Sequence, residues 1–216
     1  MTCISSPSIL YKYRSLSGDS FKFTQDIFLR RRLFLNTAWS LNDPCEGTAN
    51  QEGFGTISMN RRLACFTANE TNALMWAHYA DAHRGICIGF RTAACAALRS
   101  ARPITYQRKL PNCRVGFEDR EANKIFITKS TDWEYEQEWR VLQSNESEAF
   151  PYISLPRNSI ATVIVGVRIT EDDARWVQDW IRLFGGRIKL LQSEFSSTNY
   201  EMEIEPYDPV RFEPDD

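Results

Sequence analysis

Aromatic and charged positions alternate along residues 133–142, which is the period of a β-strand. One face of this predicted strand carries large apolar side chains and one glutamine, at Trp133, Tyr135, Gln137, Trp139 and Val141. The other face carries charged side chains, at Glu134, Glu136, Glu138 and Arg140. Neighbouring carboxylates repel one another unless solvent, a cation or a substrate relieves the repulsion. The pattern therefore leaves two alternatives, a solvated edge strand or an acidic cleft wall that carries chemistry.

Other short apolar or alternating runs predict further strands, at residues 9–15, 33–37, 63–67, 84–90, 104–106, 187–192 and 200–204. Residues 160–167 are almost continuously apolar, which is typical of a central strand buried on both faces. Helical spacing of apolar residues predicts helices over about 20–32, 72–80, 93–101 and 171–184. We expect Asn69 or Thr71 to cap the second helix, and Thr170 to cap the last.

The remaining segments are less regular. Residues 121–129 fit either a helix or a strand, and the polar residues 46–60 predict an exposed loop. No repeat or linker divides the chain. We therefore expect one α+β domain over residues 1–216, with a mostly antiparallel sheet and flanking helices.

The composition is that of an ordinary globular chain, with 43% hydrophobic and 25% charged residues. A net charge of -2 gives no global positive field that would attract nucleic acid, although it leaves room for a local basic patch. The six cysteines lack CxxC spacing, which favours reduced packing residues over a disulfide framework. The sequence shows neither a signal peptide nor a long apolar run, so we expect a cytoplasmic protein that does not associate with membranes.

The common catalytic and cofactor motifs are missing from the sequence. His78 and His83 do not share a helix face, and no cysteine pair has zinc spacing, so we predict no resident metal. A GxSxG elbow, a P-loop and a GxGxxG turn are all lacking. One metal-dependent alternative remains, in which Asp132, Glu134, Glu136 and Glu138 gather Mg²⁺ for a nuclease.

Several sequence pieces together resemble a bacterial family known as domain of unknown function 2971. The pieces are Leu10-Tyr11-Lys12-Tyr13-Arg14-Ser15, Asn42-Asp43-Pro44-x-Glu46, Cys65-Phe66-Thr67, Met75-Trp76-x-His78-Tyr79-Ala80, Gly85-Ile86-Cys87-Ile88-Gly89-Phe90 and Tyr135-Glu136-x-Glu138-Trp139-Arg140. The resemblance spans roughly residues 10–170. The order of the pieces is similar, more loosely, to the mono-ADP-ribosyltransferase superfamily and its DNA-modifying DarT-like toxins. That resemblance implies a split sheet with NAD bound as a co-substrate.

The superfamily resemblance also implies a role for individual residues. Glu138 is the expected catalytic carboxylate, and Glu136 is expected to orient or deprotonate the acceptor. The residues implied to bind NAD are Tyr13, Arg14, Ser15, Thr67, Trp76 and Tyr79. Among these, Tyr13 and Arg14 are assigned to a ribose or the pyrophosphate, Thr67 to the nicotinamide ribose, and Trp76 or Tyr79 to the nicotinamide ring. The first motif departs from the superfamily because it lacks an Arg-Gly or His-Gly pair.

The resemblance implies an NAD-dependent mono-ADP-ribosyltransferase that acts as a bacterial toxin or anti-phage defence effector. Its partners would be a macromolecular acceptor, either a nucleic acid or a protein, and an antitoxin protein. The alternatives are the metal-dependent nuclease that uses the same acidic segment, and a binding module without catalytic activity.

Overall fold

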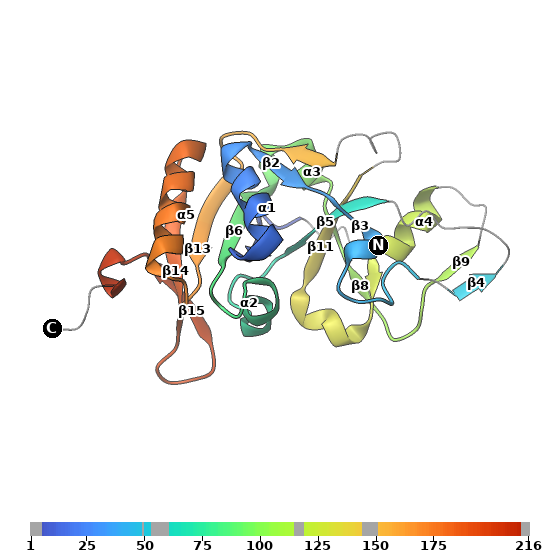
Figure 1. Cartoon of the computed structure of the whole chain (residues 1–216). Coiled ribbons are helices and arrows are strands. Elements are labelled where there is room, and N and C mark those ends of the chain that lie inside the picture. The colour runs from blue at the N-terminus through green and yellow to red at the C-terminus, as the bar shows by residue number, and fades with distance from the viewer. Residues whose placement is uncertain (1–5, 49, 53–60, 115–118, 144–150, 213–216) are drawn as a thin grey trace.

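The computed structural model describes residues 6–48, 50–52, 61–114, 119–143 and 151–212 of the 216-residue chain. Within these residues a nine-stranded sheet forms the centre of the molecule (Figure 1). Its strands follow one another in the order β15 (Met202–Pro206), β14 (Lys189–Phe195), β13 (Ile160–Val165), β6 (Ile86–Arg91), β1 (Ile9–Arg14), β5 (Arg62–Thr67), β11 (Glu138–Leu142) and β7 (Arg102–Pro103), with β3 (Asn36–Thr37) paired to β5. Neighbouring strands are antiparallel except β13 and β14, which are parallel. The predicted α+β class with a mostly antiparallel sheet is confirmed.

Three two-stranded sheets complete the β-structure of the described chain. They pair β10 (Thr128–Lys129) with β8 (Thr105–Tyr106), β12 (Tyr152–Ser154) with β2 (Arg32–Phe34), and β4 (Asn50–Glu52) with β9 (Asn112–Arg114). The predicted segment 121–129 contains both kinds of element, because α4 (Asp119–Phe126) is followed directly by β10.

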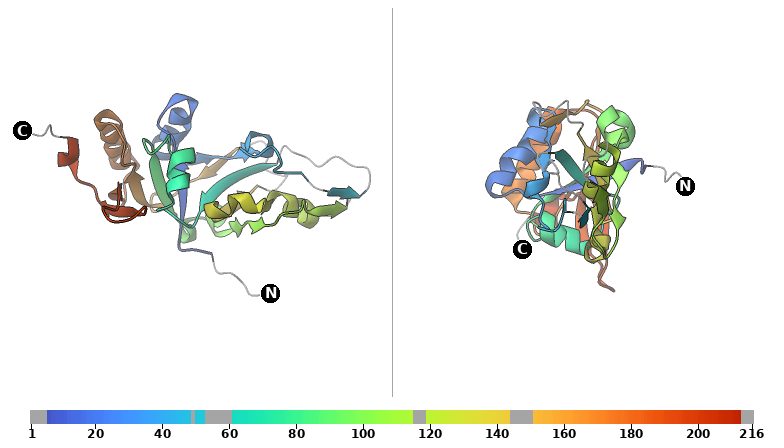
Figure 2. Two further views of the ribbon diagram at one scale, coloured as in Figure 1. Left: turned by 90° about the horizontal axis from the view of Figure 1, so that it is seen from below. Right: turned by 90° about the vertical axis from the view of Figure 1, so that its right-hand side faces the viewer.

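Helices cover both faces of the central sheet. Helices α1 (Gly18–Leu29) and α5 (Glu171–Phe184) lie side by side (Figure 2), and the rings of Phe21 and Trp180 meet edge to face with centroids 5.3 Å apart. These two helices pack on strand residues such as Leu10, Ile86 and Val163. The alternate strand residues face the other way, onto α2 (Ala73–Tyr79). The short helix α3 (Ala96–Arg99) and the turn at residues 92–94 replace the single helix predicted over 93–101.

The sheet splits between β1 and β5. Strand β1 pairs with β6 along its whole length, but its register with β5 consists of the single pair Tyr11 and Thr67. Beyond that pair the two strands diverge, and the ammonium of Lys12 donates to the carbonyl oxygen of Cys65 at 2.8 Å. A side chain thus satisfies a strand carbonyl that backbone pairing would otherwise satisfy. The result is a wedge between the two halves of the sheet.

The predicted strand over residues 133–142 is wrong in its first half. Residues Thr131–Glu136 form a 3₁₀ helix, whose first turn is capped by Ser130 through a bond from the Asp132 amide. Gln137 then takes a left-handed conformation (φ 45°), which interrupts an extended strand, and β11 begins only at Glu138. The predicted acidic face is therefore broken. Glu134 is exposed, whereas Glu136 and Glu138 are buried.

The last third of the chain follows the prediction closely. β13 is buried along most of its length, and α5 begins at the predicted cap Thr170, whose hydroxyl accepts from the Asp173 amide. Helix α2 is capped by Asn72 and not by Asn69 or Thr71. No helix within the described residues is long and apolar enough to cross a membrane.

Candidate active site

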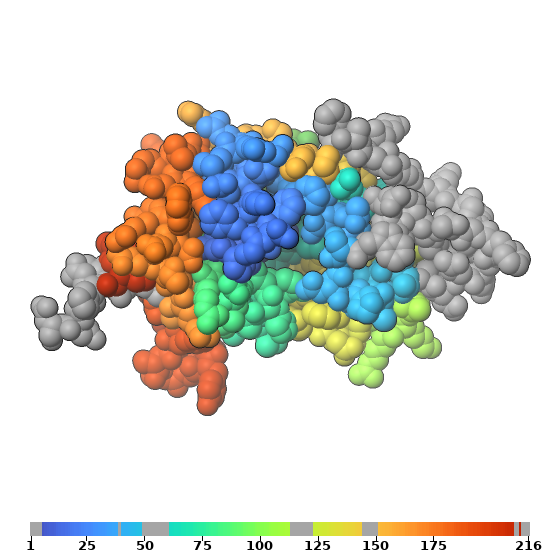
Figure 3. All heavy atoms as spheres, in the orientation of Figure 1, coloured from blue at the N-terminus to red at the C-terminus, as the bar shows by residue number. Residues whose placement is uncertain are grey.

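The wedge between β1 and β5 opens into a cavity of about 420 Å³. Figure 3 shows α1 (blue), α2 (green) and residues 41–48 (light blue) meeting on one face of the molecule, and each of these segments contributes lining residues. Of the residues predicted to form a site, those that line this cavity are Tyr13, Arg14, Ser15, Thr67, Tyr79, Glu136 and Glu138. They come from β1 and the residue after it, from β5, from α2, and from the end of the 3₁₀ helix with the start of β11. The fold thus brings together residues that are up to 125 positions apart, from 13 to 138.

Trp76 does not line the cavity. Its side chain is fully buried, its ring meets Tyr13 edge to face at 5.1 Å, and its indole N–H donates to the backbone oxygen of Glu70. The hydroxyl of Tyr13 donates to the backbone oxygen of Asn69. Trp76 therefore supports the wall that Tyr13 forms, and it does not have the access to a ligand that the superfamily resemblance implies.

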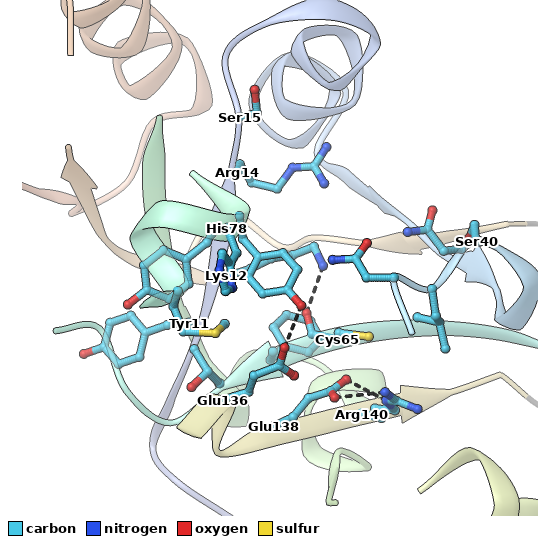
Figure 4. Close-up of a pocket in the computed structure, with 18 of the residues that line it drawn as sticks. Tyr11, Lys12, Arg14, Ser15, Ser40, Cys65, His78, Glu136, Glu138 and Arg140 are labelled. Atoms are coloured by element: carbon cyan, nitrogen blue, oxygen red, sulfur yellow. Dashed lines mark hydrogen bonds and ion pairs between the residues drawn. The ribbon is translucent and has the colours of Figure 1, made fainter. Parts of the chain in front are cut away.

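The acidic wall of the cavity is a buried cluster of five ionisable side chains, at Glu46, Lys129, Glu136, Glu138 and Arg140. The Lys129 ammonium lies 2.5 Å from Glu136, 3.2 Å from Glu46 and 3.3 Å from Glu138. The Arg140 guanidinium pairs with Glu138 (Figure 4) and also with Glu46. Three carboxylates against two cations leave one negative charge in excess when all five groups are ionised. A buried excess charge of this sign favours a cationic ligand.

Glu138 is held on both carboxylate oxygens. Nε and Nη2 of Arg140 donate to its two oxygens at 2.6 and 2.9 Å, and Lys129 approaches one of them. Burial alone would raise the pKa of Glu138, but Arg140 and Lys129 outweigh burial and lower this pKa to about 2. The fork of Arg140 makes Glu138 a firmly ionised and firmly anchored group.

Glu136 is bound more loosely. Its two oxygens accept from the Tyr79 hydroxyl at 2.6 Å and from the Lys129 ammonium at 2.5 Å, and no arginine pairs with it among the described residues. Burial raises the pKa of Glu136 above its ordinary value, against the opposing effects of Lys129 and Tyr79. A carboxylate with a raised pKa that lines a cavity is suited to binding or exchanging a proton with a ligand.

Lys129 occupies the position that a metal ion would need. Its ammonium lies within 3.3 Å of three carboxylates, and within the described chain no group of three His, Cys, Asp or Glu side chains is arranged to hold a metal. Burial lowers the pKa of Lys129, but Glu138, Glu46 and Glu136 more than compensate and raise it above its ordinary value. Because the Lys129 ammonium already lies between these three carboxylates, the Mg²⁺ site of the nuclease alternative is not formed among the described residues.

Two cations, Lys12 and Arg14, line the cavity from β1. Burial lowers the pKa of Lys12 to about 8 and that of Arg14 to about 10. Arg14 donates to the Thr24 hydroxyl and to the backbone oxygen of Ser20, which are both neutral. Within the described residues neither cation forms a salt bridge with a carboxylate, so this side of the cavity is suited to an anion.

Lys12, Glu46, Lys129 and Arg140 were not predicted as site residues. Glu46 fell in the predicted exposed loop, yet its side chain is buried against Arg140 and Lys129. The motif Asn42-Asp43-Pro44-x-Glu46 was the signal that pointed to it. Lys129 had no such signal, because its role depends on how the fold packs it between the nearby Glu136 and Glu138 and the distant Glu46.

Together these features define an α+β protein with a split sheet and a partly buried, charged cavity at the split. Residues 75–119, which include most of α2 and all of β6, match the family described as "Protein of unknown function (DUF2971)". The predicted resemblance to this family is confirmed by that match. Neither a curated protein nor a solved structure was found to match the chain.

Proposed function

We propose that this protein is an NAD-dependent mono-ADP-ribosyltransferase. The observation that carries the proposal is the wedge at the Tyr11–Thr67 pair, which joins a cationic wall on β1 to an acidic wall at Glu136 and Glu138 in one cavity. NAD has the complementary charges, with an anionic pyrophosphate and a cationic nicotinamide. Arg14 and Lys12 would hold the pyrophosphate, and Thr67 and Tyr79 would lie beside the nicotinamide ribose and ring.

The chemistry requires the negative excess of the acidic wall. Cleavage of the nicotinamide–ribose bond leaves the electron pair on nicotinamide and develops positive charge on the ribose, as in glycoside hydrolysis. The acceptor then forms a bond to the same ribose carbon and releases a proton. An ionised carboxylate beside that carbon stabilises the transition state more than the ground state.

We assign this role to Glu136 and give Glu138 the positioning role, which exchanges the two roles expected from the superfamily. Glu138 has both oxygens engaged by Arg140, so a ribose hydroxyl would have to compete with a guanidinium fork. Glu136 is bound only by Tyr79 and Lys129 among the described residues, and each carboxylate oxygen can accept a second bond.

The test is to incubate the protein with NAD labelled in its adenosine phosphate, together with separate nucleic-acid and protein fractions from a bacterial lysate. We expect label in one fraction, in proportion to the nicotinamide released. A lack of both label transfer and nicotinamide release would overturn the proposal. Glu134→Gln is the matched control for substitution of Glu136, because Glu134 lies on the same 3₁₀ helix as Glu136 but is exposed.

Whether the label is found in nucleic acid or in protein distinguishes the two expected biological roles. Label in the nucleic-acid fraction would fit a DarT-like toxin with an antitoxin partner, and label in the protein fraction would fit an effector that modifies proteins. Degradation of nucleic acid without NAD, abolished by EDTA, would instead support the nuclease alternative. The ammonium of Lys129 between the three carboxylates argues against that alternative.

A further inference from the structure

The turn after α2 has an unusual backbone. Asp81, Ala82 and His83 all have positive φ, at 51°, 49° and 69°. Positive φ is uncommon for residues other than glycine, and such strain persists only where the surrounding structure enforces it. Three consecutive residues of this kind indicate that the surrounding structure holds the turn in this conformation.

Close backbone packing enforces this turn. A Cβ atom at Gly85 would lie 2.2 Å from the carbonyl oxygen of Arg14 and 3.1 Å from Ala80. The amide of Gly85 donates to Ala80, and that of His83 to Trp76. The turn is thereby fixed against the end of β1, next to Arg14.

The turn places Asp81 at the cavity. Asp81 is partly buried and is among the residues that line the cavity, as is Arg14. Within the described part of the chain, the carboxylate of Asp81 has no hydrogen-bond donor and no salt-bridge partner. Every carboxylate of the acidic wall has such partners. A carboxylate without a donor, on a residue that lines a cavity, is suited to accept bonds from a ligand.

Arg14 lies away from the acidic wall, and the turn that carries Asp81 is packed against the end of β1 at Arg14. Glu138 is in register with Thr67, and Thr67 with Tyr11, so the acidic wall lies at the closed end of the wedge. Arg14 is three residues further along β1, which corresponds to roughly 10 Å. An extended dinucleotide bound at the acidic wall would therefore place its second nucleotide beside Arg14 and Asp81.

We propose that Asp81 binds the 2′-hydroxyl of the adenosine ribose, with Arg14 on the adjacent phosphate. A carboxylate accepts a bond from a ribose hydroxyl, and it repels a 2′-phosphate. The choice of adenosine rests on the proposed function. Asp81 would therefore select NAD over its 2′-phosphorylated form.

The test measures binding of three probes by calorimetry: AMP, 2′-deoxy-AMP and adenosine 2′,5′-bisphosphate. The wild type should bind AMP about 10- to 100-fold more tightly than 2′-deoxy-AMP, because a hydrogen bond to a charged group is lost. Asp81→Gly removes the carboxylate at a position where glycine suits the backbone, and it should abolish this preference. Asp81→Asn should improve binding of the bisphosphate by removing the repulsion.

Ala82→Gly is the matched control. It relaxes the same strained turn but keeps the carboxylate, so it should keep the preference for AMP. Equal binding of AMP and 2′-deoxy-AMP by the wild type, no binding of AMP, or an unchanged preference in Asp81→Gly would overturn the proposal. Nicotinamide release is measured on the same samples. If nicotinamide is released but the preference for AMP over 2′-deoxy-AMP does not depend on Asp81, the ribose site alone is rejected. If that preference depends on Asp81 but no nicotinamide is released, the transferase function alone is rejected.

Discussion

The hydroxyl of Tyr79 donates a hydrogen bond of 2.6 Å to a carboxylate oxygen of Glu136. This bond joins the C-terminal end of α2 to the last residue of the 3₁₀ helix, 57 positions later in the chain. It favours the ionised form of Glu136, whereas burial favours the neutral form. Burial, Lys129 and Tyr79 therefore together set the pH range in which Glu136 carries its charge.

Tyr79→Phe should shift the pH dependence of activity. The pKa of Glu136 is already raised by burial, and loss of the hydroxyl should raise it further, because the ionised form loses a donor. We expect the acidic limb of the kcat profile for nicotinamide release to move to higher pH. An acidic limb that stays in place or moves to lower pH would contradict the role of Glu136. Tyr106→Phe, which removes a hydroxyl bonded to a backbone amide of the same region, is the control.

Glu138→Gln should destabilise the fold strongly. Glu138 is buried, and the substitution leaves the Arg140 guanidinium without its bidentate partner. Breaking a buried ion pair from one side costs about 3–5 kcal/mol, measured as the free energy of unfolding in urea. The exposed variant Glu134→Gln should change this free energy by less than about 0.5 kcal/mol. Equal stabilities of the two variants would show that the cluster does not support the fold.

The stability conferred by Glu138 should disappear in acid. Its pKa is lowered to about 2 in the fold, against about 4.3 for an unperturbed glutamate. A lowered pKa gives stability that is present above the unfolded value and is lost as pH falls through the folded value. The difference in unfolding free energy between wild type and Glu138→Gln should therefore narrow between about pH 4.3 and pH 2. A constant difference over this range would refute the assignment.

Binding of an anionic nucleotide should take up protons near pH 8. Burial lowers the pKa of Lys12 to about 8, so a large fraction of Lys12 is neutral there, and a phosphate beside it would raise the pKa again. Calorimetry of NAD binding in buffers of different ionisation enthalpy measures this uptake. Lys12→Met should abolish it. Uptake that is unchanged in this variant would assign the proton to another group.

The local parts of the fold could be predicted from the sequence. Strand β13 and helix α5 were predicted because an apolar run and a Thr170 cap act within a few residues. Residues 133–137 were predicted wrongly because alternation alone does not show that Gln137 turns left-handed. Alternation in a short segment thus predicts a strand wrongly when one residue inside the segment takes a conformation that interrupts it.

The candidate site could be predicted in part. The motifs supplied Tyr79, Glu136 and Glu138 with roles, and they contained Glu46 and Arg140 without assigning a role to either. Arg140 and Glu46 are 94 positions apart, and only the folded sheet brings them together. The relative roles of Glu136 and Glu138 followed from how many donors each one meets, which no sequence pattern records.

The most direct test compares nicotinamide release from NAD by the wild type, Glu136→Gln and Glu134→Gln, with the fold of each protein checked by its urea unfolding. Our account predicts release by the wild type and by Glu134→Gln, and a loss of at least about 100-fold in kcat for Glu136→Gln, the scale of one missing group that stabilises transition-state charge. A folded wild type that releases no nicotinamide, or a Glu136→Gln variant as active as the wild type, would contradict it.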